Sequence, residues 1–394
     1  MKILGIVAEY NPFHNGHLLH IEESRKAVSY DTAVVCVMSG DFMQRGEAAV
    51  FSKYARAEAA VRCGADLILE LPLPWSLASA EGFARGSVGL LGALNCVNYL
   101  SFGSECGDLG ILNSLATALE DPVLDLDIRE ELKNGISYAA ARQAALAKSI
   151  GSLADHLATP NNILAVEYLK AIYDQRLRIE PVTIKRVGAG HDEEGGSASD
   201  IRGMLSQDKP IKKFVPKAAA EVFKRETEQG RGPVFMEDLE TAILSRFRFM
   251  SEDDFSMIPD DSEGLGGKLY AAAREEMTLD GVLSAAKSKR YALSRLRRMC
   301  LCAALGIRKG QSDDNPPYAR VLAANETGRA ALKIIGGKSL IPVITKPASV
   351  KELSHECSSL FELESSAHDL YVLGYKAQEE RRGNADWRTS PKMI

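Results

Sequence analysis

Short apolar runs alternate with longer stretches of helical periodicity through the first half of the chain. The apolar runs are rich in β-branched residues, which is typical of strands that are buried on both faces. They span residues 3–8, 33–38, 67–71, 97–102 and 181–187. The helical patterns span residues 18–29, 52–63, 78–94, 136–148 and 162–173. Strands that alternate with helices predict βαβ units, so we expect an α/β fold with a Rossmann-like, doubly wound parallel sheet.

The pattern changes after about residue 205. Residues 206–217 contain two prolines and four lysines, a composition that favours a linker. The helical patterns beyond it span residues 236–249, 267–276, 285–305 and 326–335, and residues 339–345 predict a short strand. We therefore expect two domains, residues 1–210 and a mainly helical (α+β) region of residues 211–394.

Composition limits the class of protein. The 394 residues are 45% hydrophobic and carry a net charge of −5, so a nucleic-acid partner would need a local basic patch. Seven scattered cysteines without a CxxC pair predict a reducing compartment and no metal site. No apolar stretch approaches the roughly 18 residues of a membrane span, so we expect a soluble, cytoplasmic protein without membrane contact.

The stretch AEYNPFHNGHLLH, residues 8–20, follows the first predicted strand. Ligands of open parallel sheets bind beyond the carboxyl ends of strands, where helix N-termini direct free N–H groups at anions. Pro12 keeps Asn11 extended, and Gly16 lets the backbone approach a ligand. His14 and His17 would then donate to phosphate oxygens and stabilise the charge that develops when a triphosphate loses pyrophosphate. His20 is interpreted as an ordinary residue.

The tetrapeptide HNGH at residues 14–17 resembles the HxGH signature of the nucleotidyltransferase superfamily, in which both histidines contact the phosphates of ATP. Residues 196–202, GSASDIR, resemble its ISSTxIR element, with glycine in place of the leading isoleucine. Only Ser197, Ser199, Ile201 and Arg202 therefore carry over. Either motif alone could be ordinary: a helix start with incidental histidines, or a serine N-cap with an exposed arginine. Their pairing at the expected ends of the domain favours a phosphate site, with His14, His17 and Arg202 catalytic.

Three further segments lie at predicted strand ends or helix starts, where loops often carry function. They are residues 38–47 (MSGDFMQRGE), 102–105 (FGSE) and 159–165 (TPNNILA). Each also has a simpler interpretation. Asp41 could only pair with Arg45, Gly103 could only turn the chain, and Asn161 could only cap a helix.

Together these segments resemble a narrower family, the bacterial tRNA(Met) cytidine acetate ligases, over nearly the whole chain. The motifs that carry the resemblance are GIVAEYNPFHNGH, MSGDFMQRGE, SFGSE, PNNILAVEYL, KRVGAGHD with SASDIR, and KSKRYALSRLRR. The resemblance implies an enzyme that activates acetate with ATP as acetyl-adenylate, releasing pyrophosphate. The acetyl group then passes to N4 of the wobble cytidine (position 34) of elongator tRNA(Met), releasing AMP, without acetyl-CoA.

The resemblance also implies the ATP contacts. They are Val7, Ala8, Glu9, Asn11, His14, Gly16, His17, Gly103, Asn161, Asn162, Arg186, Val187 and Ser199. Mg²⁺ is expected with the triphosphate. No Ser-His-Asp or Cys-His arrangement indicates an enzyme-bound acyl group, so direct transfer from the adenylate is the simpler hypothesis.

Residues 287–298, KSKRYALSRLRR, hold six basic residues and no acidic one. Such a patch suits phosphate contacts, and Tyr291 could stack on an anticodon base. The predicted tRNA-binding residues are Lys289, Arg290, Arg295, Arg297 and Arg298, with Lys212, Lys213, Lys217 and the basic tail at residues 381–392 also available. The simpler interpretation is a solvated charged helix. No protein partner is predicted.

Two other functions stay open from the sequence. A small-molecule adenylyltransferase would use the same HxGH chemistry, although it would not need clustered arginines in a large second region. A non-enzymatic RNA-binding protein with a relic nucleotide fold would not need intact His14, Gly16, His17 and Arg202.

Overall fold

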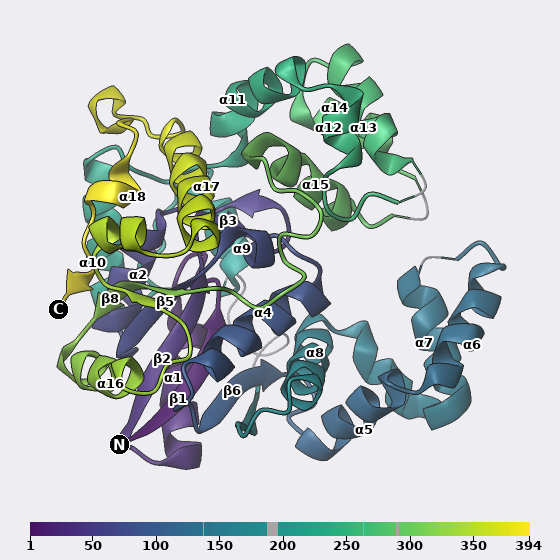
Figure 1. Cartoon of the computed structure of the whole chain (residues 1–394), viewed down its shortest axis with the longest axis horizontal. Coiled ribbons are helices and arrows are strands. Elements are labelled where there is room, and N and C mark those ends of the chain that lie inside the picture. Colours follow the sequence, from purple (N-terminus) through teal and green to yellow (C-terminus); the bar gives the residue numbers. More distant parts are fainter. Residues whose placement is uncertain (137, 187–195, 263, 289–290) are drawn as a thin grey trace.

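The computed structural model describes residues 1–136, 138–186, 196–262, 264–288 and 291–394 (Figure 1). A sheet with the strand order β10-β8-β5-β2-β1-β6-β7 forms its centre, with β9 paired to β8. Its strands are β1 (Lys2–Ala8), β2 (Thr32–Ser39), β5 (Leu67–Leu71), β6 (Tyr99–Ser104), β7 (Glu180–Lys185), β8 (Ala319–Ala324), β9 (Val343–Ile344) and β10 (Lys392–Met393). Strands β3 (Phe42–Met43) and β4 (Glu47–Ala48) form a separate antiparallel hairpin.

The five strands predicted from the first half pair in parallel, which confirms the α/β fold class. Strand β2 shows why its sequence is apolar throughout, since every residue of it is buried. Ala33, Val35 and Val37 belong to the core on one face of the sheet. Val34, Cys36 and Met38 belong to the core on the other. Helices therefore cover both faces, as in a doubly wound sheet.

The helices follow most of the predicted patterns. In the first half they are α1 (Asn15–Val28), α2 (Lys53–Arg62), α3 (Leu73–Ser76), α4 (Ala80–Ala93), α5 (Leu109–Leu119), α6 (Pro122–Leu132), α7 (Tyr138–Ile150) and α8 (Pro160–Asp174). In the second half they are α9 (Ala198–Leu205), α10 (Lys217–Glu228), α11 (Met236–Phe249), α12 (Glu252–Ser256), α13 (Leu265–Glu275), α14 (Leu279–Ala286), α15 (Leu293–Leu305), α16 (Glu326–Gly336), α17 (His355–Val372) and α18 (Ala385–Arg388). Short 3₁₀ helices in the described part of the chain span Gly151–Ala158, Pro347–Glu352 and Gln378–Glu380.

One predicted helix is wrong. Residues 285–305 do not form a continuous helix, because α14 ends at Ala286 and α15 begins at Leu293. Within the basic stretch, residues 293–298 belong to α15, and Lys287 and Ser288 follow the end of α14.

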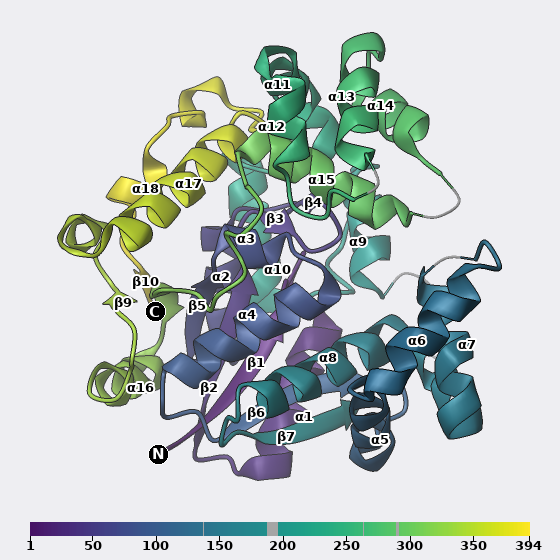
Figure 2. The same cartoon turned by 45° about the vertical axis from the view of Figure 1, so that its right-hand side comes forward.

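Helices α11 to α15 form a group of their own, with a core that also includes residues of the β3–β4 hairpin and of α17. Both views place this group on the side of the sheet where the hairpin lies (Figure 2). Among the described helices, none is long and apolar enough to cross a lipid bilayer.

The chain returns to the sheet near its end. Strand β8 pairs antiparallel with β5, and β9 and β10 pair with β8. The strand expected at residues 339–345 is thus present as β9. The division into domains at residue 210 stays a prediction, and the sheet itself crosses that boundary.

A buried cluster of charges joins this returning segment to the rest of the sheet. The Nζ atom of Lys53 lies 2.8 Å from Glu70 and 2.6 Å from Asp386. Arg320 of β8 lies 2.6 Å from the same Asp386 and 3.1 Å from Glu70. The side chains are at most 4% exposed. Asp41 is a further buried carboxylate, 4.0 Å from Lys53. These buried charges depend on one another, because none of them is well solvated.

We expect Asp386→Asn to destabilise the protein by about 3–5 kcal/mol, because it removes the carboxylate that lies nearest to both buried cations, Lys53 and Arg320. The free energy of unfolding in urea measures this change. Glu23→Gln is the matched control, since it breaks an exposed pair with Lys26 and should change stability by less than about 0.5 kcal/mol. Equal stability of the two variants would contradict the interpretation.

Candidate active site

The histidine motif builds its own helix cap. His14 is the N-cap of α1, and its Nδ1 atom accepts a hydrogen bond from the backbone N–H of Gly16 at 3.0 Å. The backbone N–H of His14 donates in turn to Nδ1 of His17 at 3.2 Å. This is a capping box in which imidazoles replace the usual hydroxyl and carboxylate. The histidines are therefore a structural part of the turn and are not incidental.

These two bonds fix the protonation of both rings. A nitrogen that accepts a hydrogen bond carries no proton, so each neutral imidazole holds its proton on Nε2. The ring centroids lie 3.8 Å apart with planes tilted by 32°, so the two rings are stacked at a tilt. The motif thus provides two Nε2–H donors with fixed orientation at a helix N-terminus.

Gly16 is required by this stacking. A Cβ atom at this position would lie 2.8 Å from Cε1 of His14. Any side chain would push the imidazole away from its hydrogen bond. From the sequence we expected Gly16 to let a ligand approach the backbone. In the structure, the atoms nearest to an added Cβ belong to the His14 ring.

The surroundings keep the histidines uncharged. Burial, assisted by the positive charge of Arg186, lowers the pKa of His14 to about 4. Burial and the neighbouring His14, Arg186 and His20 hold the pKa of His17 well below its usual range. The pKa of His20 also falls to about 4 through burial and Arg186, and its Nε2 atom lies 3.1 Å from the Ser101 hydroxyl. Near neutral pH all three are neutral.

Strands β6 and β7 lie beside β1, next to the histidine turn. The sheet order places β1 beside β6, and the chain leaves β1 in one direction for β2 and β5 and in the other for β6 and β7. This is a topological switch point, where open parallel sheets form a crevice. Gly103 lies within β6, so the view that it only turns the chain is wrong, and an added Cβ would lie 3.2 Å from Cγ of Arg186. Val187 lies outside the described residues.

Asn161 and Asn162 form a hydrogen-bond network with Glu105. The Glu105 carboxylate accepts hydrogen bonds from the Asn161 side chain at 2.6 Å and from the Asn162 backbone at 2.8 Å. The Asn162 side chain accepts from the backbone N–H groups of Glu105 and Cys106. Burial of the Glu105 carboxyl group raises its pKa, but these hydrogen bonds outweigh burial, so the pKa is lowered overall. Glu105, which directly follows β6, thus caps helix α8, a role that the sequence did not reveal. ATP contacts of Asn161 and Asn162 stay predictions.

Arg202, in the GSASDIR motif, contacts the loop that precedes the HNGH motif. Its guanidinium donates to the Asn11 carbonyl at 3.0 Å and to the Ser199 hydroxyl at 3.2 Å. It also lies 3.3 Å from Glu47. Ser197 is indeed an N-cap, in a capping box with Asp200. Arg202 is half-buried and bridges two loops, which does not fit a simple exposed arginine.

The loop after β1 is held by its own polar groups. The Asn11 side chain accepts from the Val50 backbone at 2.9 Å, and Glu9 accepts from the Gln44 backbone at 2.7 Å. Burial raises the pKa of the Glu9 carboxyl group. Val7 and Ala8 are the last residues of β1. The predicted ATP residues before His14 thus lie in one ordered segment that leads to the histidines.

The hairpin segment differs from its simplest interpretation. Asp41 is buried and lies 2.7 Å from the His368 imidazole, so it does not pair with Arg45. Arg45 is exposed at the hairpin. Glu47, which the sequence did not single out, contacts Arg202 on one side and Arg297 at 3.1 Å on the other.

The predicted tRNA-binding arginines have different environments. Arg298 is 8% exposed and lies 2.9 Å from Asp260, so it is part of the helical core. Arg295 donates to the Ser262 hydroxyl at 2.8 Å and lies over the Tyr291 ring. Arg297 is half-buried beside Glu47. Lys289 and Arg290 lie outside the described residues, and tRNA contacts of all five stay predictions.

A protein-made metal cage is absent from the described part of the chain. No group of three or more His, Cys, Asp or Glu side chains there could hold a metal ion. Mg²⁺ bound mainly through phosphates would not need such a cage.

Comparison with known proteins agrees with this geometry. The profile of the HIGH nucleotidyl transferase family matches residues 1–386. The tRNA(Met) cytidine acetate ligase of Acetivibrio thermocellus is 38% identical over 98% of both chains. The enzyme of the same name from Caldanaerobacter subterraneus is 41% identical over 95% of this chain and 96% of its own.

A solved structure covers the whole fold. Thermotoga maritima TmcAL bound with alpha-thio ATP superposes with a TM-score of 0.93 and 34% identity, and each chain is covered completely. The apo form of the same protein gives a TM-score of 0.95. The chain belongs to the HIGH nucleotidyl transferase family, among the tRNA(Met) cytidine acetate ligases.

Proposed function

We propose that this protein is an ATP-dependent ligase that acetylates N4 of the wobble cytidine (position 34) of elongator tRNA(Met). The observation that carries the proposal is the pair of neutral imidazoles, His14 and His17, held by backbone N–H groups at the switch point. The family relationship and the ATP-analogue complex of the Thermotoga neighbour support ATP as the substrate.

In the first step, a carboxylate oxygen of acetate attacks the α-phosphorus of ATP. The bond between the α-phosphorus and the bridging oxygen breaks, and pyrophosphate leaves with the electron pair. Charge grows on the phosphate oxygens during this step, and pre-oriented Nε2–H donors stabilise it without reorganisation. Arg202 and Arg186 would add positive charge at the phosphates.

In the second step, the N4 amine of the cytidine attacks the carbonyl carbon of acetyl-adenylate. A C–N bond forms, the C–O bond to the adenylate breaks, and AMP leaves while the amine loses one proton. The adenylate supplies the leaving group that a free carboxylate lacks. Acyl transfer directly from the adenylate requires no enzyme nucleophile.

Mg²⁺ is part of the proposal as a companion of the triphosphate, whose negative charge it would neutralise when bound. Glu9, in the loop that leads to the histidines, is a carboxylate that could contact it directly or through water. The histidines and arginines would act on phosphate oxygens in either case.

We expect His14→Asn to reduce acetate-dependent ATP–pyrophosphate exchange by about 10²–10³-fold, because asparagine keeps an N-cap acceptor but lacks the Nε2–H donor. Exchange needs no RNA, so it reports the first step alone. His355→Asn, on the exposed surface of α17, is the matched control and should exchange normally. Normal exchange by His14→Asn would refute the assigned role.

The lowered histidine pKa values predict a pH dependence of stability. Between about pH 4 and the unfolded value near 6.5, the unfolded chain binds protons at His14 that the folded chain does not bind. Stability should therefore fall as the pH drops through this window. Urea midpoints at pH 7.5 and 5.5 should show a smaller loss in His14→Asn than in the wild type or in His355→Asn. An equal loss in all three proteins would contradict the assigned pKa shift.

A further inference from the structure

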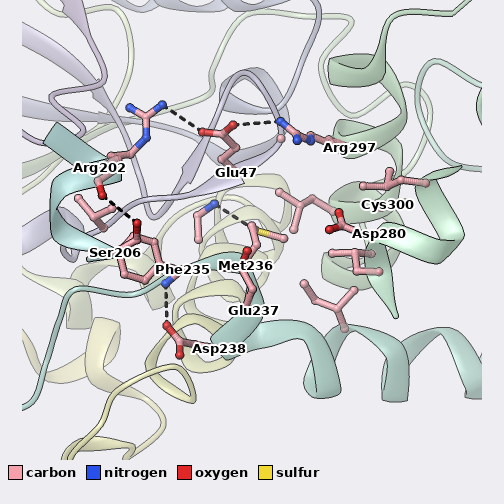
Figure 3. A pocket seen from close by; sticks show the side chains of 18 residues that line it. Glu47, Arg202, Ser206, Phe235, Met236, Glu237, Asp238, Asp280, Arg297 and Cys300 are labelled. Carbon is pink, nitrogen blue, oxygen red and sulfur yellow. Dashed lines mark hydrogen bonds and ion pairs between the residues drawn. The ribbon is translucent and has the colours of Figure 1, made fainter. Parts of the chain in front are cut away.

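A cavity of about 520 Å³ lies between the sheet layer and the helical group, next to the histidine site (Figure 3). Its walls come from the β3–β4 hairpin, α9, the start of α11, α14 and α15. Neither the histidines nor Gly103 and Arg186 line it. Its volume is within the usual range for a small-molecule pocket.

One wall of the cavity is shared with the phosphate site. Arg202 lines the cavity and also donates to the carbonyl of Asn11, three residues before His14. The opposite wall contains Arg297, from the basic stretch predicted to contact tRNA. The cavity thus lies between the place where the adenylate would form and a surface suited to RNA.

The lining suits a flat heterocycle. Buried apolar side chains, among them Ile243, Leu283 and Leu301, form part of the wall. The half-buried Phe235 adds an aromatic ring. Unstacked RNA bases are commonly held between aromatic and apolar side chains.

The polar side chains Arg202, Glu47 and Arg297 form a row of ion pairs along the cavity wall. Glu47 lies 3.3 Å from Arg202 through one carboxylate oxygen and 3.1 Å from Arg297 through the other. Figure 3 shows the two arginines reaching Glu47 from opposite sides. The hairpin cannot shift freely, because a Cβ on Gly46 would lie 2.6 Å from the Arg297 backbone. A carboxylate flanked by two guanidiniums is therefore fixed at the cavity.

The carboxylate of Glu47 and the guanidinium beside it match the pairing edge of cytosine. Cytosine presents an N4 amine donor beside the N3 and O2 acceptors, so a carboxylate can accept from N4 while a guanidinium donates to N3 and O2. Uracil presents the O4 acceptor in place of the amine, which would face the Glu47 carboxylate unfavourably.

We propose that this cavity receives the acceptor cytidine, flipped out of the anticodon, and that Glu47 with Arg297 reads the amine edge of the base, while Arg202 faces the phosphates. The proposal rests on the proposed function and adds the binding site of the acceptor. ATP itself, as an alternative occupant, is an outcome of the test below.

Gly203 allows the cavity to be blocked with little cost to packing. It lines the cavity from α9, and a Cβ placed on it meets no atom within 4 Å. We expect Gly203→Phe to exchange ATP and pyrophosphate with acetate as the wild type does, but to transfer acetyl to elongator tRNA(Met) about a hundredfold more slowly. Gly336→Phe is the matched control, because Gly336 is also a helical glycine with open space at Cβ and lies on α16.

The two assays separate the proposals. A wild type that neither exchanges pyrophosphate nor acetylates tRNA would refute the proposed function itself. With an active wild type, normal transfer by Gly203→Phe would overturn the cavity proposal. Loss of both exchange and transfer in Gly203→Phe, with a folded protein by thermal unfolding, would also overturn it and assign the cavity to ATP or acetate.

Base reading is tested by binding without ATP. Anticodon stem-loop RNAs that differ only by C or U at the wobble position serve as probes, and we expect the wild type to favour C by about tenfold. In Glu47→Gln the amide can rotate to donate to O4, so the preference should shrink towards equality. Glu237→Gln, which removes an exposed carboxylate of the same cavity, should keep the preference. An unchanged preference in Glu47→Gln would overturn the role of Glu47.

Discussion

The site depends on two backbone hydrogen bonds to imidazole nitrogens. Backbone N–H groups occupy Nδ1 of His14 and Nδ1 of His17, so the opposite nitrogens of both rings remain as donors. The same bonds cap the first turn of α1, which means that the helix cannot form normally without orienting the rings. Burial then keeps both rings neutral. Folding of one helix end therefore sets the orientation and protonation of two groups that can act on a triphosphate.

The rest of the fold brings further groups to this turn. The switch point between β1 and β6 places Gly103 and Arg186 beside it. Arg202 ties the start of α9 to the loop after β1, and Glu47 extends this connection to Arg297 in the helical group. A continuous set of contacts thus runs from the phosphate site to the cavity proposed for the acceptor base. Separate regions of the chain contribute to one site because these ion pairs join them.

Local patterns predicted the central strands and the histidine turn, because buried parallel strands and helix caps are encoded within a few residues. Contacts between distant segments were not predictable. Strand β8 joins β5 across about 250 residues, and Lys53 meets Asp386 across 333. The environment of Arg298 was not predictable for the same reason, since it is set by Asp260, 2.9 Å away, and by burial. Glu105 and Glu47 gave no periodic signal because each acts through partners far along the chain.

The role of the two imidazoles can be measured on their own ring nitrogens, through the protonation of His14 and His17 in the ATP complex. Nitrogen NMR of the ¹⁵N-histidine-labelled protein, assigned with His14→Asn, distinguishes protonated from unprotonated ring nitrogens. We expect a proton on Nε2 and none on Nδ1 in both rings at neutral pH, with Nε2–H coupled to phosphate when the nucleotide is bound. A proton on Nδ1 of either ring, or Nε2 signals that ATP leaves unchanged, would contradict it.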